Sequence, residues 1–350
     1  MSRRLTLTVL SGGLLVAGAF AWSCGGGEDT TDAGNDGSAD TSNPDTSKPE
    51  TGSDGATDAG TDGSDGAVGP RCTTSKPFGA ITLVAELGGA DAGSSGARLT
   101  NDSLTVFYAA NPTAALNGTI ETATRDASTS TFGASTALTT LADAAVQGLD
   151  PSISPDGLTL YAQFNPSNFV EIVYGTRANT SANWNYSTGI TNLSGSAPNH
   201  GAPYLQGDNS TLWYAARVAP DGGATQGGGS LDIFKGDVTG AGQLANLTGV
   251  NEVNTTFDET SVAITSNGLS IYFARKEATD GGASGTFHVF STTRAATTDP
   301  FPAPTLVQEL DDMPTTNTSP TWVSPDNCVI YLQSDRGGPA GGIYVATRPL

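Results

Sequence analysis

The chain has 350 residues with 35 acidic against 15 basic side chains, so its formal net charge is −20. Nucleic acids and anionic membrane surfaces bind proteins through a basic footprint, and this charge excludes both as partners. Only two His and three Cys are present, so we expect no metal site and no cofactor.

Residues 1–23 have the pattern of an export signal. Two arginines precede an uncharged stretch, residues 5–21, which is shorter than a transmembrane helix and interrupted by Gly. Cleavage after Ala21 fits the small-x-small rule, whereas residues 21–24 (AWSC) resemble a bacterial lipobox. We favour the lipobox, which makes Cys24 the lipid-bearing residue. The resemblance implies an exported cell-envelope lipoprotein, anchored in the outer membrane on its periplasmic or surface face, with membrane contact only through the lipid.

Residues 24–70 are expected to form a disordered acidic tether. From residue 25 onward they contain 11 Gly and 11 acidic residues, and Val68 is the single large aliphatic side chain. Such a segment cannot bury enough apolar surface to offset the entropy lost on ordering. Its Asp-Gly steps lack the closing Glu of a calcium loop, so we interpret them as solvated.

One pattern recurs five times in residues 71–350. Its clearest copy, residues 152–161 (SISPDGLTLY), is an extended run, a tight Asp-Gly turn and a strand that ends in an aromatic residue. The repeat spacing is 53 to 59 residues, with the aromatics at Phe107, Tyr161, Tyr214, Tyr272 and Tyr331. The turns, predicted at residues 102–103, 156–157, 209–210, 267–268 and 326–327, use residue types that tolerate positive φ, so their acids are structural.

Each copy continues with a third strand that ends in a basic residue, at Arg125, Arg177, Lys235, Arg294 and Arg348. A fourth strand follows in 132–141, 184–193 and 301–310, with a looser copy at 243–247. The last copy lacks it, but residues 77–87 match 300–310. We therefore predict an all-β fold, a five-bladed β-propeller of four-stranded blades, closed by an N-terminal strand that completes the last blade.

The cysteines agree with this closure. Cys72 lies just before the closing strand and Cys328 lies in the blade that this strand completes. We predict a disulfide between them, which an exported location permits and which leaves Cys24 unpaired. The alternative is two unrelated thiols.

The Ser-Pro-Asp-Gly turn, together with residues 334–338 (SDRGG) and 343–348 (IYVATR), resembles the TolB-type WD-like β-propeller repeat of bacterial exported proteins. The resemblance covers nearly all of residues 73–350. It implies a propeller that serves as a binding scaffold, and it carries no shared catalytic residues.

The sequence offers one enzymatic alternative. A serine hydrolase is excluded because no G-x-S-x-G nucleophile elbow is present. A glycoside hydrolase needs only two suitably separated carboxyl groups. The loops entering the first strand of each repeat hold Asp91, Asp143, Asp150, His200, Asp258, Glu259, Asp311 and Asp312. Among them Asp150, Asp258 and Glu259 are the candidates for acid and base on the rim of the ring.

Other candidate contacts follow from the predicted innermost strands. Tyr204 and Trp322 could stack on a sugar or a peptide side chain, and Arg98 occupies the same strand of the first repeat. His200 is expected at the rim, whereas His288 is expected in packing. We expect a non-enzymatic binding or assembly module whose partner is a protein or polysaccharide of the cell envelope.

Overall fold

The computed structural model describes residues 72–88, 93–111, 118–140, 146–165, 170–187, 189–190, 193, 200–217, 230–277, 285–313 and 315–350. All of them belong to one compact unit, Asp65–Leu350. The expected signal peptide, the predicted lipid-bearing Cys24 and the whole expected tether lie outside the described residues, as do Asp91 and Asp143.

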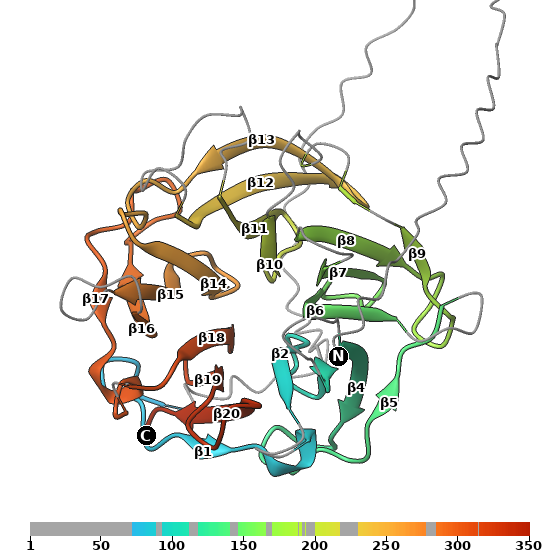
Figure 1. Cartoon of the computed structure of the whole chain (residues 1–350), viewed down its shortest axis with the longest axis horizontal. Helices are drawn as coiled ribbons and strands as arrows, with labels where there is room; N and C mark the ends of the chain where they lie inside the picture. Colours follow the sequence, from blue (N-terminus) through green and yellow to red (C-terminus); the bar gives the residue numbers. More distant parts are fainter. Residues whose placement is uncertain are drawn as a thin grey trace, which may run out of the picture. The chain divides into compact units, whose positions relative to one another are not determined.

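The described part is nearly all β, and its sheets stand around a common centre (Figure 1). The strands nearest the centre are β2 (Ser94–Leu99), β6 (Gln147–Ile153), β10 (His200–Leu205), β14 (Asp258–Ile264) and β18 (Thr318–Val323). The next strands outward are β3 (Thr105–Ala110), β7 (Thr159–Phe164), β11 (Thr211–Ala216), β15 (Ser270–Glu277) and β19 (Val329–Ser334). This radial arrangement is that of a β-propeller.

The third strands are β4 (Gly118–Thr124), β8 (Glu171–Thr176), β12 (Asp232–Gly240), β16 (Thr286–Thr293) and β20 (Gly342–Thr347). The outermost strands are β1 (Thr82–Leu83), β5 (Thr136–Ala137), β9 (Asn185–Ser187), β13 (Gln243–Gly249) and β17 (Thr305–Leu306). Three sheets have four antiparallel strands, in the orders β1-β20-β19-β18, β10-β11-β12-β13 and β14-β15-β16-β17. The remaining eight strands form one sheet because β4 pairs with β6 as well as with β5.

The turns between first and second strands have the predicted chemistry. The second turn residue has a positive φ in each repeat, at Ser103, Gly157, Asn209, Gly268 and Asn327. The preceding Asp or Asn accepts a hydrogen bond from the backbone N–H two residues later, for example Asp156 from Leu158 at 2.9 Å. These Asp and Asn side chains stabilise the turn by bonding its own backbone, as expected from the residue types.

The third repeat corrects the predicted alignment. Its turn is Asp208-Asn209, one residue earlier than expected, because Asn209 adopts the positive φ of 62° and the Asp208 carboxylate accepts from the Ser210 N–H. Trp213 rather than Tyr214 therefore takes the position of the repeated aromatic. Lys235 pairs with Trp213 in mid-strand, so it does not end the third strand as predicted.

In the other four repeats the predicted basic residue is an arginine with one shared role. Each Nε donates to the carbonyl of the positive-φ turn residue, from Arg125 to Ser103, Arg177 to Gly157, Arg294 to Gly268 and Arg348 to Asn327, at 2.7 to 3.1 Å. Each guanidinium also lies over an aromatic ring, 3.9 to 4.6 Å from its centre: Phe132, Trp184 and Phe301 belong to the segment that follows the arginine, and Phe78 to the N-terminal segment. This clamp ties the first turn of a sheet to its outer edge.

The last clamp joins sequence-distant segments, because Arg348 and Phe78 come from opposite ends of the described unit. The predicted Cys72–Cys328 disulfide is present beside it and spans 256 residues. Strand β1 pairs with β20, with Thr82 opposite Val345. The apolar core lies between neighbouring sheets, and its largest cluster includes Tyr272, Val323 and Ile330.

Candidate functional site

The innermost strands share a β-bulge close to the centre. In four of them the bulged residue has a positive φ, namely Gly96, Asp150, Ala202 and Ser261. The fifth has Pro320 at this position, whose ring fixes a negative φ. Bulges re-aim the side chains that follow them, and here they place Arg98, Tyr204 and Trp322 around one small cavity.

Arg98 reaches from β2 to two other innermost strands, β10 and β14. Its side chain is almost fully buried, with 3% of the residue exposed. Nη1 donates to the Val262 carbonyl at 3.2 Å, Nη2 donates to Pro203 at 3.1 Å, and the guanidinium carbon lies 4.2 Å from the centre of the Tyr204 ring. Burial lowers the Arg98 pKa to about 10. The cavity that remains is about 20 Å³, which is room for about one water molecule.

Asp150 lies beside this cation. Burial raises the pKa of its carboxyl group, while the nearby Arg98 charge opposes the rise. The backbone of Asp150 passes so close to Gly96 that a Cβ on Gly96 would lie 2.5 Å from the Asp150 Cα. Glycine at position 96 is therefore required for the close approach of β2 and β6. Of the candidates named from the sequence, the structure places Arg98, Tyr204 and Trp322 around one cavity, with Asp150 beside Arg98.

Asp258 and Glu259 belong to a separate group at the start of β14. Asp258 Oδ1 accepts from the Leu231 N–H at 2.8 Å and lies 3.4 Å from Arg217 Nη1. Glu259 is completely buried and forms an ion pair of 2.8 Å with Arg275, its partner across the sheet. Burial raises the Glu259 pKa. Glu259 therefore does not lie on an open rim, because its pairing with Arg275 holds the carboxylate in the interior.

His200 begins β10 and is buried. Its Nδ1 accepts a hydrogen bond from the Ile172 N–H at 3.1 Å, which requires the neutral imidazole. Burial lowers the His200 pKa. This contact holds β10 against β8, apart from the Arg98 group.

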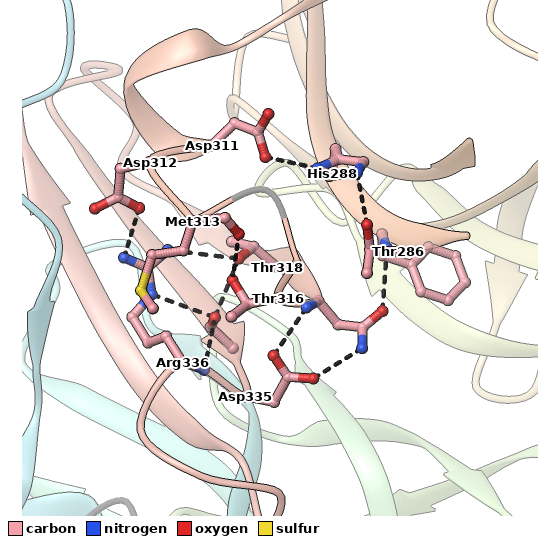
Figure 2. A network of polar contacts seen from close by, with 12 residues as sticks. Thr286, His288, Asp311, Asp312, Met313, Thr316, Thr318, Asp335 and Arg336 are labelled. Atoms are coloured by element: carbon pink, nitrogen blue, oxygen red, sulfur yellow. Dashed lines mark hydrogen bonds and ion pairs between the residues drawn. The ribbon is translucent and has the colours of Figure 1, made fainter. Parts of the chain in front are cut away.

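Sequence reasoning missed the partner of His288. Figure 2 shows that Asp311 and Thr286 flank its ring, with Asp311 Oδ1 2.6 Å from Nδ1 and the Thr286 hydroxyl 2.8 Å from Nε2. On the other side of the same loop, Asp312 pairs with Arg336 at 2.9 Å. The loop between β17 and β18 is thus fixed to two sheets. The only signal for it in the sequence was the pair of acids that follows Leu310.

Two larger grooves lie between sheets, and no single repeat indicates them. One, of about 330 Å³, is lined by Glu86, Arg125, Phe132, Trp322 and Tyr331 among others. The other, of about 540 Å³, is lined mainly by residues of β3, β4 and the turns of the first two repeats, with Phe107 and Arg177 facing it. Both combine residues that lie far apart in sequence. In the part of the chain that the structure describes, no group of three or more His, Cys, Asp or Glu could hold a metal ion.

No protein-family model and no curated protein sequence matches the chain. Among solved structures, TolB from Acinetobacter baumannii is 14% identical with a TM-score of 0.42; the match covers 74% of this chain but only 55% of TolB. A glycosyl hydrolase from Bacteroides ovatus is 12% identical over 73% of this chain and 84% of its own, with a TM-score of 0.44. The catalytic domain of a GH62 α-L-arabinofuranosidase from Coprinopsis cinerea is 11% identical over 78% and 97%, with a TM-score of 0.43.

The described unit is thus defined by its own geometry as a β-propeller (Figure 1) in which the buried Arg98 of β2 bonds two other innermost strands, β10 and β14. No helix among the described residues is long and apolar enough to cross a membrane.

Proposed function

We propose that this protein is a non-enzymatic cell-envelope lipoprotein whose β-propeller acts as a binding or assembly module for a protein or glycan. Cys24 carries the lipid, and residues 24–70 tether the propeller to the outer membrane. The acidic charge of the chain and the pattern of residues 1–24 support this placement.

We further propose that the propeller has five blades and is closed by β1. The β4–β6 pairing that merges the first two sheets consists of two residue pairs, Gly118 with Gly148 and Thr119 with Gln147. We therefore treat the eight-stranded sheet as two blades that touch. Closure is supported by β1 on β20, by Arg348 over Phe78, and by the hydrogen bond from the Phe78 N–H to Glu309 at 3.0 Å.

One observation favours binding over catalysis. The central cavity between Arg98, Tyr204 and Trp322 is about 20 Å³, far below the roughly 300–1,000 Å³ of a typical small-molecule site. A sugar ring therefore does not fit into this central cavity beside Asp150. The grooves between sheets, of about 330 and 540 Å³, have the size of a ligand site, and the two carboxylates of the larger one, Asp102 and Asp156, each hold their own turn through Oδ1.

The alternative is a five-bladed glycoside hydrolase that uses Asp150, Asp258 and Glu259. The observation that favours it is the raised pKa of Asp150 and of Glu259, because a general acid must hold its proton near neutral pH. In this alternative, one of the three single Ala substitutions abolishes activity without unfolding the protein.

The deciding experiment incubates the purified protein with a panel of bacterial and plant polysaccharides and records binding and reducing-sugar release in the same samples. Binding without release supports the proposal, and release at a rate that depends on one of the three acids supports the hydrolase. Metabolic labelling with palmitate tests the anchor, and the Cys24→Ser variant should lose the label.

A further inference from the structure

An arginine–tyrosine contact is found at two of the junctions between neighbouring sheets. Between the sheets of β15 and β20, Arg348 Nη2 donates to the Tyr272 hydroxyl at 3.0 Å, and that hydroxyl donates to Asn327 Oδ1 at 2.8 Å. Between the sheets of β19 and β4, Arg125 and Tyr331 line the same groove; burial raises the pKa of Tyr331, and the nearby Arg125 charge opposes this rise. In both places the arginine clamp of one sheet reaches a tyrosine of the sheet before it.

At the next position around the ring the tyrosine is replaced. Phe107 pairs with Arg98 in the same register in which Tyr331 pairs with Trp322, so Phe107 occupies the tyrosine position without a hydroxyl. The clamp of the following sheet, Arg177, uses Nε for the Gly157 carbonyl at 2.7 Å and Nη1 for the Thr180 carbonyl at 2.7 Å. Its Nη2 has no hydrogen-bond partner among the described residues, and the groove of about 540 Å³ lies there.

The lining of this groove combines apolar surface with polar groups. Thr100, Thr105, Thr122, Thr124, Thr180 and Asn101 contribute hydroxyl and amide groups. Asp102 and Asp156 each use Oδ1 inside their turn, through the Leu104 and Leu158 N–H groups. Their second carboxylate oxygens, Oδ2, have no hydrogen-bond partner in the described structure. The Phe107 side chain is buried and forms part of the lining.

The charges in the groove decide which ligand fits. One guanidinium faces two carboxylates in a chain of net charge −20, which disfavours an anionic ligand. A neutral polyol satisfies both kinds of group, since each hydroxyl can accept from Arg177 and donate to a carboxylate oxygen. An apolar ligand would leave these groups unpaired.

We propose that this groove, which we call the Phe107 groove, binds a neutral sugar unit of a glycan. One sugar hydroxyl accepts from Arg177 Nη2, and neighbouring hydroxyls donate to Asp102 and Asp156. The inference rests on the proposed binding function and names its ligand class and its location on the propeller.

The test is the Phe107→Tyr variant of the full chain, because it restores the hydroxyl that the equivalent tyrosines offer to their clamp. Calorimetric titration with cellotriose, maltotriose and xylotriose, and with trigalacturonate as the charged counterpart, measures binding. We expect at least one neutral trisaccharide to bind the unmodified protein. We expect Phe107→Tyr to weaken it at least about tenfold, since the new hydroxyl takes the Arg177 N–H and narrows the groove.

The matched control is Tyr331→Phe, which removes the corresponding hydroxyl at the neighbouring junction and should leave trisaccharide affinity unchanged. An unchanged melting temperature of Phe107→Tyr shows that the fold is intact. Equal affinity of Phe107→Tyr and the unmodified protein would overturn the assignment of the groove while leaving glycan binding in place. Failure of all neutral trisaccharides, or tighter binding of trigalacturonate, would overturn the ligand class. Capture of an envelope protein alongside such a failure would leave the proposed binding function standing.

Discussion

Removal of the Cys72–Cys328 disulfide tests whether the ends of the described unit are held together by a covalent constraint. The bond closes a loop with a sequence separation of 256 residues. The chain-entropy relation gives about 5.5 kcal/mol for such a loop, and measured disulfides typically contribute about 2–4 kcal/mol. We therefore expect Cys72→Ala with Cys328→Ala to lower the free energy of unfolding by about 2–5 kcal/mol.

Urea unfolding followed by tryptophan fluorescence and circular dichroism measures this loss. The dependence of the free energy on urea should become steeper, because the unfolded chain without the cross-link exposes more surface. Unfolding of the unmodified protein in the presence of a reductant is the matched control, since it breaks the bond without changing a side chain. A loss below about 1 kcal/mol in both experiments, with an unchanged urea slope, would refute the reasoning.

Three further predictions concern single residues. Arg294→Met should lower the free energy of unfolding by about 2 kcal/mol, because it removes the hydrogen bond to the turn and the stacking on Phe301; a loss below about 0.5 kcal/mol on urea unfolding would contradict the clamp. Burial lowers the His200 pKa, so the unfolded state takes up a proton first and stability is lost as the pH falls below the unfolded value of about 6.5. His200→Asn should make the free energy of unfolding less dependent on pH in this range. An unchanged pH dependence would contradict the lowered His200 pKa. Arg98→Met should raise the pKa of Asp150, because the Arg98 charge lowers it; carbon-13 titration of the carboxyl group measures the shift, and a fall would contradict the placement of Asp150.

The turns and the disulfide could be predicted because their causes are local or follow from repeat order. An Asp or Asn before a positive-φ residue marks the turn in every copy. The third repeat was misaligned by one residue because Asp208-Asn209 and Asn209-Ser210 both satisfy that rule. Only strand pairing, which places Trp213 opposite Lys235, decides between them.

The candidate site was predicted in part. Their positions in the predicted innermost strands indicated Arg98, Tyr204 and Trp322, but the bulges that gather them depend on backbone φ values that the sequence does not reveal. Glu259 was expected on an open rim but is buried. Its burial depends on an ion pair with Arg275 of the neighbouring strand, and the sequence does not indicate that pair. The Phe107 groove could not be predicted, because it lies between two repeats and is lined by Phe107 of one and Arg177 of the next.

The short outer strands affect how this protein meets other copies of itself. β1, β5, β9 and β17 have only two or three residues, so they offer almost no row of free backbone groups to a neighbouring chain. β13 is longer, with seven residues, but its pairing with β12 is interrupted twice and Asn246 has a φ of 50°. Such irregularities twist a sheet edge away from a regular partner. Among the described strands the periphery is therefore a poor template for intermolecular β-pairing.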